Sequence, residues 1–232
     1  MEIRRIAFSC VIFYDIQLIL CLILVYETSM SGLDTLIARS LDSTIRENLG
    51  EQTYQKLERR LFERHGIGFT QAVEDFRKLD SVLREFFGNG AEGVEKQIID
   101  KIMILEQSKH QEKRWITIED QSLTKLILES LGDEDKKNIL NAVIDQSRII
   151  SDILETSRIP QTSGYRKVNT LIQSGMLIPE GFATTHDGKR VTKYRSVFEN
   201  ISIEIEKNKV IVKVQPTKES LKNSHIMQLV CL

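Results

Sequence analysis

The sequence predicts a chain that is mostly α with a small β part, an α+β class. Apolar residues recur at three- and four-residue steps from residue 33 to residue 107, which is the spacing of helix faces. Shorter helical segments follow residue 122, and alternating segments around turn signals follow residue 176. The 232 residues, 41% hydrophobic and 28% charged, suffice for one large or two small globular domains.

Four amphipathic helices are expected in an N-terminal domain spanning residues 33–107. The expected segments are 33–49, 51–65, 70–87 and 91–107, and each carries one apolar face. Glycines between segments supply the helix ends: Gly50, Gly66 and Gly88. Short glycine turns between amphipathic helices are typical of a small bundle.

Residues 108–121 are polar and charged apart from Trp115, Ile116 and Ile118, so we interpret them as a linker that contains one short strand or turn. Three helices and then a β-hairpin follow over residues 133–196, with the Asp187-Gly188 pair as a strong hairpin turn signal. This order predicts a winged helix-turn-helix over residues 122–214. A second alternating hairpin is expected over residues 201–214, and residues 215–232 are left as a C-terminal tail.

The helix expected after Pro160 has an unusual polar side. Val168, Leu171 and Ile172 form its apolar face and would pack on the preceding helices, while Gly164 suits a close approach between helices. Gln, Asn and Arg side chains suit base edges in the major groove, and short polar groups near a helix N-terminus can bind phosphates. From Arg158 to Arg195 there are seven basic and two acidic residues, a local net charge of +5 in a chain of net charge −1. Nucleic-acid binding requires such local positive charge.

The predicted function is therefore a transcription regulator that binds double-stranded DNA as a homodimer. The candidate DNA-binding residues lie on the polar-faced helix and the hairpin: Gln161, Thr162, Ser163, Tyr165, Arg166, Lys167, Asn169, Lys189, Arg190 and Lys193. The alternative is a non-catalytic protein-interaction adaptor, anchored to a membrane in one version. The dimer interface is left open between the bundle helices and the C-terminal tail.

No enzyme, metal site or cofactor is predicted. Cys10, Cys21 and Cys231 form no CxxC pair, and the four histidines have no partner at helical spacing. The Gly88–Gly93 segment fits G-x-G-x-x-G, but a helical pattern precedes it, whereas a dinucleotide site requires a strand. We interpret that segment as a glycine turn between two helices.

Two resemblances extend this interpretation. The segment "LESLGDEDKKNILNAVIDQSRIISDILETSRIPQTSGYRKVNTLIQSGML" resembles the winged-helix domain of ArsR-like archaeal transcription regulators. The metal ligands of that family's metal sensors are absent here, so the resemblance does not imply metal sensing. The segments "LGEQTYQKLERRLFERHGI" and "LREFFGNGAEGVEKQII" are similar to the Nitrosopumilus output domain family. That second resemblance implies a sensing, dimerising or partner-binding role, and it adds no catalytic residue.

Residues 6–26 are mostly apolar and long enough to span a bilayer, which requires about 20 residues. Arg4 and Arg5 before this segment would keep the N-terminus inside and send the rest of the chain outside, the wrong side for DNA. The other interpretation is that Met30 is the true start and residues 1–29 are upstream sequence. Under it the protein is expected in the cytoplasm, and a membrane anchor is expected only if residues 1–29 are translated.

Overall fold

The structure, a computed structural model, describes residues 32–106 and 114–230. These residues belong to one compact unit. The apolar segment 6–26, with its two interpretations, lies outside the described residues, as do residues 107–113 of the predicted linker. In the described part of the chain, no helix has the length and apolar character needed to cross a membrane.

The N-terminal part is helical, as predicted, with some boundaries displaced. It contains α2 (Gly32–His65), α3 (Phe69–Glu74), α4 (Phe76–Phe87), a 3₁₀ turn (Gly88–Gly90) and α5 (Ala91–Ile102). Gly50 lies inside α2 at φ 76° and ψ 157°, so the predicted join is a kink where two helical segments meet. The predicted helix 70–87 is divided at Asp75, whose backbone angles, φ −120° and ψ 81°, are not helical.

The fourth predicted helix ends earlier than expected. Residues 103–105 were expected to be helical, and this is wrong because they form strand β1 (Met103–Leu105). The free carbonyl of Ile102 accepts hydrogen bonds from the backbone amides of Glu119 and Asp120, at 2.9 and 3.1 Å. A later segment therefore supplies hydrogen-bond donors for the carbonyl at the end of α5, and the chain continues from α5 into strand β1.

A four-stranded antiparallel sheet connects the N-terminal helices to the C-terminal part. Its order is β1, β2 (Ile116–Ile118), β6 (Lys209–Pro216) and β5 (Phe198–Glu206). Strand β2, from the segment expected to be a linker, is internal: Ile118 pairs with Met103 on one side and with Val212 on the other. The second predicted hairpin is present as β5 and β6, joined at Glu206 and Lys209.

The C-terminal part has the predicted order of helices and hairpin, so the chain is mostly α with a small β wing. The helices are α6 (Gln121–Gly132), α7 (Glu134–Asn141), α8 (Ile150–Ser157) and α9 (Gln161–Gln173). The wing is the hairpin of β3 (Leu177–Thr184) and β4 (Arg190–Ser196), which forms a separate two-stranded sheet. Asp120 and Asp133 cap α6 and α7 by accepting backbone N–H groups at 2.7 and 3.1 Å.

The segment expected to be a tail is folded against the start of α2. It contains α10 (Lys218–Asn223) and α11 (His225–Val230). The buried carboxylate of Asp34 accepts hydrogen bonds from the Ser224 hydroxyl and from the His225 amide, the latter at 2.9 Å. Ile226 and Met227 are buried in the core. These two side chains are thus covered within one chain.

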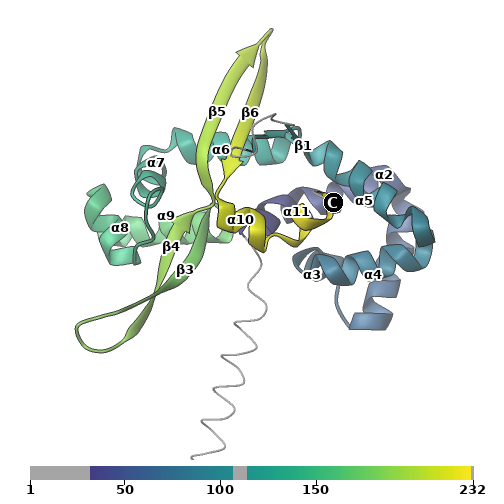
Figure 1. The fold of residues 1–232 in the computed structure, drawn as a ribbon, viewed down its shortest axis with the longest axis horizontal. Coiled ribbons are helices and arrows are strands. Elements are labelled where there is room, and N and C mark those ends of the chain that lie inside the picture. The colour runs from purple at the N-terminus through teal and green to yellow at the C-terminus, as the bar shows by residue number, and fades with distance from the viewer. Residues whose placement is uncertain (1–31, 107–113, 231–232) are drawn as a thin grey trace, which may run out of the picture. The chain divides into compact units, whose positions relative to one another are not determined.

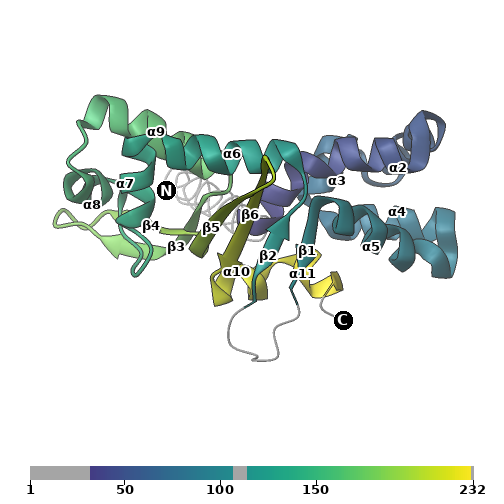
Figure 2. The ribbon, with the colours of Figure 1, turned by 90° about the horizontal axis from the view of Figure 1, so that it is seen from above.

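Helix α2 also contacts the end of α9. A Cβ atom on Gly32 would lie 1.9 Å from Cγ2 of Ile178, and one on Gly175 would lie 2.5 Å from the Gly32 carbonyl oxygen. The Ser40 hydroxyl donates a 2.7 Å hydrogen bond to Asp120, the capping residue of α6. Figure 2 shows α2, α6 and α9 following one another along one side of the sheets.

Candidate nucleic-acid interface

Helices α8 and α9 form a helix-turn-helix with a three-residue turn. Arg158 ends α8 in the left-handed conformation at φ 55°, and its backbone amide donates to the Glu155 carbonyl at 3.1 Å. The Ile159 amide donates to the Leu154 carbonyl at 3.0 Å, and Pro160 then precedes the first residue of α9. Figure 1 shows α8, α9 and the β3–β4 hairpin close together, on the left of the view.

Gly164 allows α9 to pack closely on α8. A Cβ atom at Gly164 would lie 2.4 Å from Cδ2 of Leu154 and 3.2 Å from Cγ2 of Ile159, both of which are buried side chains. Val168 and Leu171 on the same side of α9 are fully buried. The apolar face predicted for this helix is therefore the face that holds it against the rest of the domain.

The opposite face of α9 is exposed. The exposed side chains that were predicted for this face are Gln161, Thr162, Tyr165, Arg166 and Asn169. Ser163 is only half-buried, and its hydroxyl donates to the Pro160 carbonyl at 3.3 Å. The exposed face continues past Asn169 to Thr170 and Gln173. Thr170 was missed although it lies one helical turn after Arg166, and that spacing could have identified it.

Lys167 differs from the other predicted DNA-binding residues because it is already paired. Its ammonium group donates to both carboxylate oxygens of Asp133, at 2.7 and 2.9 Å, and lies 2.9 Å from Asp135 Oδ2. The hydrogen bond from Lys167 lowers the pKa of Asp133, and those carboxylates raise the pKa of Lys167. Lys167 therefore fixes the start of α7 against α9.

The wing has an ordered tip at the predicted Asp187-Gly188 turn. Gly188 has φ 77°, and its amide donates to the Thr185 carbonyl at 2.9 Å. The Thr185 hydroxyl donates to the Asp187 carboxylate, and Lys189 lies 2.9 Å from that carboxylate, so both contacts lower its pKa. The Lys189 side chain is 79% exposed despite this pair.

The remaining wing cations lie on two different faces. The guanidinium of Arg190 stacks over the Phe182 ring at 3.8 Å. Lys193 is three residues further along β4, so the alternation of a strand places it on the opposite face from Arg190. It shares that face with Arg195, which pairs with Glu180 at 3.1 Å. Arg190 and Lys193 therefore do not form one patch.

Pairing within the chain reduces the positive charge that the sequence suggests. Of the seven basic residues from Arg158 to Arg195, three form ion pairs with carboxylates: Lys167, Lys189 and Arg195. Arg158, Arg166, Arg190 and Lys193 form no ion pair with a described residue. Arg158 is exposed in the turn before α9. It was not among the predicted DNA-binding residues, although its position next to the start of α9 could have identified it.

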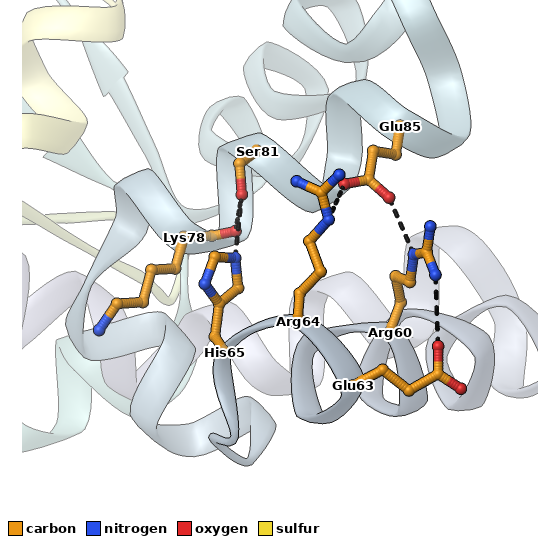
Figure 3. A network of polar contacts seen from close by, with 7 residues as sticks. All are labelled: Arg60, Glu63, Arg64, His65, Lys78, Ser81 and Glu85. Atoms are coloured by element: carbon orange, nitrogen blue, oxygen red, sulfur yellow. Dashed lines mark hydrogen bonds and ion pairs between the residues drawn. The ribbon is translucent and has the colours of Figure 1, made fainter.

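A second polar network links α2 to α4, away from α9. Figure 3 shows Glu85 between two arginines of α2: Arg60 Nε lies 2.8 Å from one carboxylate oxygen and Arg64 Nε lies 2.7 Å from the other. Next to it is an open hollow of about 380 Å³, lined partly by Lys56, Arg59 and Phe86. Arg60 and Arg64 of α2 thus bridge to α4 through Glu85.

The remaining sequence motif has the predicted structure. Gly88–Gly90 forms a 3₁₀ turn directly after helix α4, so the G-x-G-x-x-G segment is a glycine turn between two helices. Within residues 32–106 and 114–230, no three His, Cys, Asp or Glu side chains are grouped as metal ligands. Comparisons of the chain with protein-family models, with curated proteins and with solved structures each find no match.

Proposed function

We propose that the chain binds double-stranded DNA through α9 and the wing, as a transcription regulator of the ArsR-like kind. The observation that carries this proposal is the exposed face of α9, where Gln161, Tyr165, Arg166 and Asn169 follow a helix-turn-helix turn. In such motifs the second helix enters the major groove and its first residues contact base edges. Amide and guanidinium groups match the donor and acceptor pattern of those edges.

The wing supplies contacts that are independent of sequence. Lys189 is highly exposed at the ordered tip, and Arg190 is held over Phe182, so both cations can approach phosphates. Arg158 and Arg166 add positive charge on either side of the start of α9. Lys167 has no part in this proposal, since its ammonium group binds Asp133 and Asp135.

Salt-dependent binding of the full-length chain to double-stranded DNA tests the proposal. Titrations use a fluorescent duplex of mixed sequence, and a binding-site selection then supplies a preferred duplex. Arg166→Ala is expected to reduce the preference for the selected site over the mixed duplex. Lys189→Ala is expected to weaken both duplexes alike and to lower the salt slope by about 1, since one phosphate contact is lost.

Lys209→Ala is the matched control for Lys189→Ala. Lys209 is 71% exposed and pairs with Glu119 at 3.7 Å, but it belongs to the β5–β6 hairpin. It is expected to leave affinity and salt slope unchanged. The DNA proposal is lost if Arg166→Ala and Lys189→Ala both bind like the unmodified chain, and a protein-interaction adaptor without catalytic activity then becomes the better interpretation.

A further inference from the structure

Among the described residues, strand β5 is an unpaired edge of its sheet and carries an exposed apolar stripe. In the order β1-β2-β6-β5, β5 is the last strand, and among the described residues it pairs only with β6. Figure 1 shows the β5–β6 hairpin extending away from the helices and pointing away from the β3–β4 wing. Long edge strands with apolar side chains pair with other chains unless they are covered or carry charge that prevents it.

The stripe is a continuation of the core. The cross-strand pairs Ile201–Val214, Ile203–Val212 and Ile205–Val210 all lie on one face of the hairpin. On β6, Val212 and Val214 are fully buried, whereas on β5 Ile203 is 44% exposed and Ile205, nearer the hairpin tip, is 73% exposed. Exposing such an aliphatic surface to water costs free energy, and this cost is removed when another surface covers it.

We propose that the occupant of this edge is β5 of a second copy of the chain, paired antiparallel about a two-fold axis at Ile203. In that register Ile203 is opposite its own copy and Ile201 is opposite Ile205 of the partner strand. Ser202 is then opposite Glu204, and Asn200 is opposite Glu206. Between residues 200 and 206, every apolar residue meets an apolar residue and every glutamate meets a neutral polar side chain, which is the favourable pattern for cross-strand pairs.

Neighbouring registers lack this complementarity. An axis at Glu204 would place two glutamates opposite each other, which is destabilising. An axis between Ser202 and Ile203 would place Ser202 opposite Ile203, Glu204 opposite Ile201 and Asn200 opposite Ile205, which moves the stripe out of register. An axis at Ser202 would place Ile205 opposite Glu199 and Glu206 opposite Phe198. The strand is therefore self-complementary in one register, the property that a two-fold symmetric interface requires. The two sheets would join into one, with the apolar stripe continuous across the axis.

The oligomeric state of the full-length chain without DNA tests this inference. Light scattering during size-exclusion chromatography is expected to give a dimer. Ile203→Lys places two ammonium groups at the axis and is expected to weaken dimerisation on the order of 100-fold. Ile104→Lys is the matched control, because Ile104 is 47% exposed and lies on β1 at the other edge of the same sheet. Circular dichroism confirms that both variants are folded.

A cysteine at the axis gives a second test, which detects the interface directly and does not require that dimerisation be weakened. Ile203→Cys is expected to form an intermolecular disulfide under mild oxidation, because directly opposed residues of antiparallel strands have Cα atoms about 4.5–5.5 Å apart. Mass spectrometry must show the peptide linking residue 203 to residue 203. Lys209→Cys, on the strand away from the edge, is the control and is expected to form no such link.

Three results would overturn the inference: a monomeric full-length chain, a dimer that persists in Ile203→Lys, or the absence of the 203–203 link. All three are read without DNA, so they are distinct from failure of the DNA-binding proposal. A chain that dimerises through β5 and does not bind DNA would support the interface and remove the proposed function.

Discussion

The guanidinium of Arg39 on α2 donates a 3.0 Å hydrogen bond to the backbone carbonyl oxygen of Gln173, the last residue of α9. The final carbonyls of a helix have no partner within the helix, so a cation there satisfies one and interacts favourably with the helix dipole. Helix α9 is thus held at its C-terminal end by the N-terminal helices while its N-terminal face is exposed.

The contact between Gly175 and α2 gives the first prediction. Gly175→Ala is expected to lower the free energy of unfolding by about 2–5 kcal/mol, because φ is +82° and the new Cβ would lie 2.5 Å from the Gly32 carbonyl oxygen. Gly188→Ala is the matched control, with φ +77° and no neighbouring atom within 4 Å. It is expected to cost about 1 kcal/mol. Equal losses in urea unfolding would show that backbone strain alone determines the cost.

Two helical glycines are expected to respond to alanine with opposite sign. Gly164→Ala in α9 should destabilise the protein by about 1–3 kcal/mol, because its Cβ must displace the buried Leu154 side chain. Gly93→Ala in α5 meets no atom within 4 Å and should stabilise by about 0.5–1 kcal/mol through helix propensity. Thermal melts of the two variants compare them, and a stabilising Gly164→Ala would contradict the close approach of α8 and α9.

Lys167 is expected to matter for stability and not for DNA. Lys167→Ala should lower the free energy of unfolding at neutral pH, since its partly exposed ion pairs with Asp133 and Asp135 are lost. Because the pKa of Asp133 is lowered from its ordinary value of 3.8, its ionised carboxylate stabilises the folded chain at pH values above 3.8. That contribution is lost as the pH falls through the folded-state pKa. The difference between variant and unmodified chain should therefore shrink in acid.

The control for this variant is Lys137→Ala on the exposed side of α7. It should leave stability within about 0.5 kcal/mol of the unmodified chain. The DNA salt slope of Lys167→Ala should equal that of the unmodified chain, and a lower slope would mean that Lys167 leaves its carboxylate partners to bind phosphate.

The buried carboxyl group of Glu95 predicts a stability that falls as the pH rises from mildly acidic to mildly alkaline values. Its side chain is 2% exposed, and burial, with a hydrogen bond to Asp80, raises its pKa to about 8. A carboxyl group with a raised folded-state pKa holds its proton in the folded chain while the unfolded chain loses it. Stability should therefore decrease as pH rises from the ordinary value of 4.5 to about 8.

Glu95→Gln removes the titrating group and keeps its shape. Urea unfolding at several pH values should show a flatter profile for this variant, more stable than the unmodified chain above pH 8 by on the order of a few kcal/mol. Glu92→Gln, exposed on the same helix and paired with Arg84 at 3.2 Å, is the control and should keep the original slope. A Glu95→Gln profile parallel to the unmodified one would refute the assignment.

Local chemistry made much of the fold predictable. Gly50, Gly66 and Gly88 have positive φ at predicted helix ends, and the Asp187-Gly188 turn joins the predicted hairpin. The exposed side of α9 followed from helical spacing alone, because its apolar residues are all on the buried side. These features depend on residues only a few positions apart.

Features that depend on distant residues could not be predicted in this way. The three-residue strands β1 and β2 are too short to show a period of two, and their partners lie elsewhere in the chain. The pairing of Lys167 with Asp133 joins α9 to the cap of α7, which helical spacing does not show. The opposite faces of Arg190 and Lys193 could have been inferred, since an odd separation on a strand reverses the side.

The position of β2 between β1 and β6 has consequences for folding during synthesis and for the choice of fragments for experiments. During synthesis β2 is made before β6, so at first β2 can pair only with β1. Until β6 follows, the second edge of β2 has no partner strand and its aliphatic side chains are exposed. A fragment limited to residues 122–214 would leave the inner edge of β6 bare and remove Ile116 and Ile118 from the core. Binding measurements on such a fragment would report a damaged sheet, so the proposed DNA binding is best studied in the intact chain.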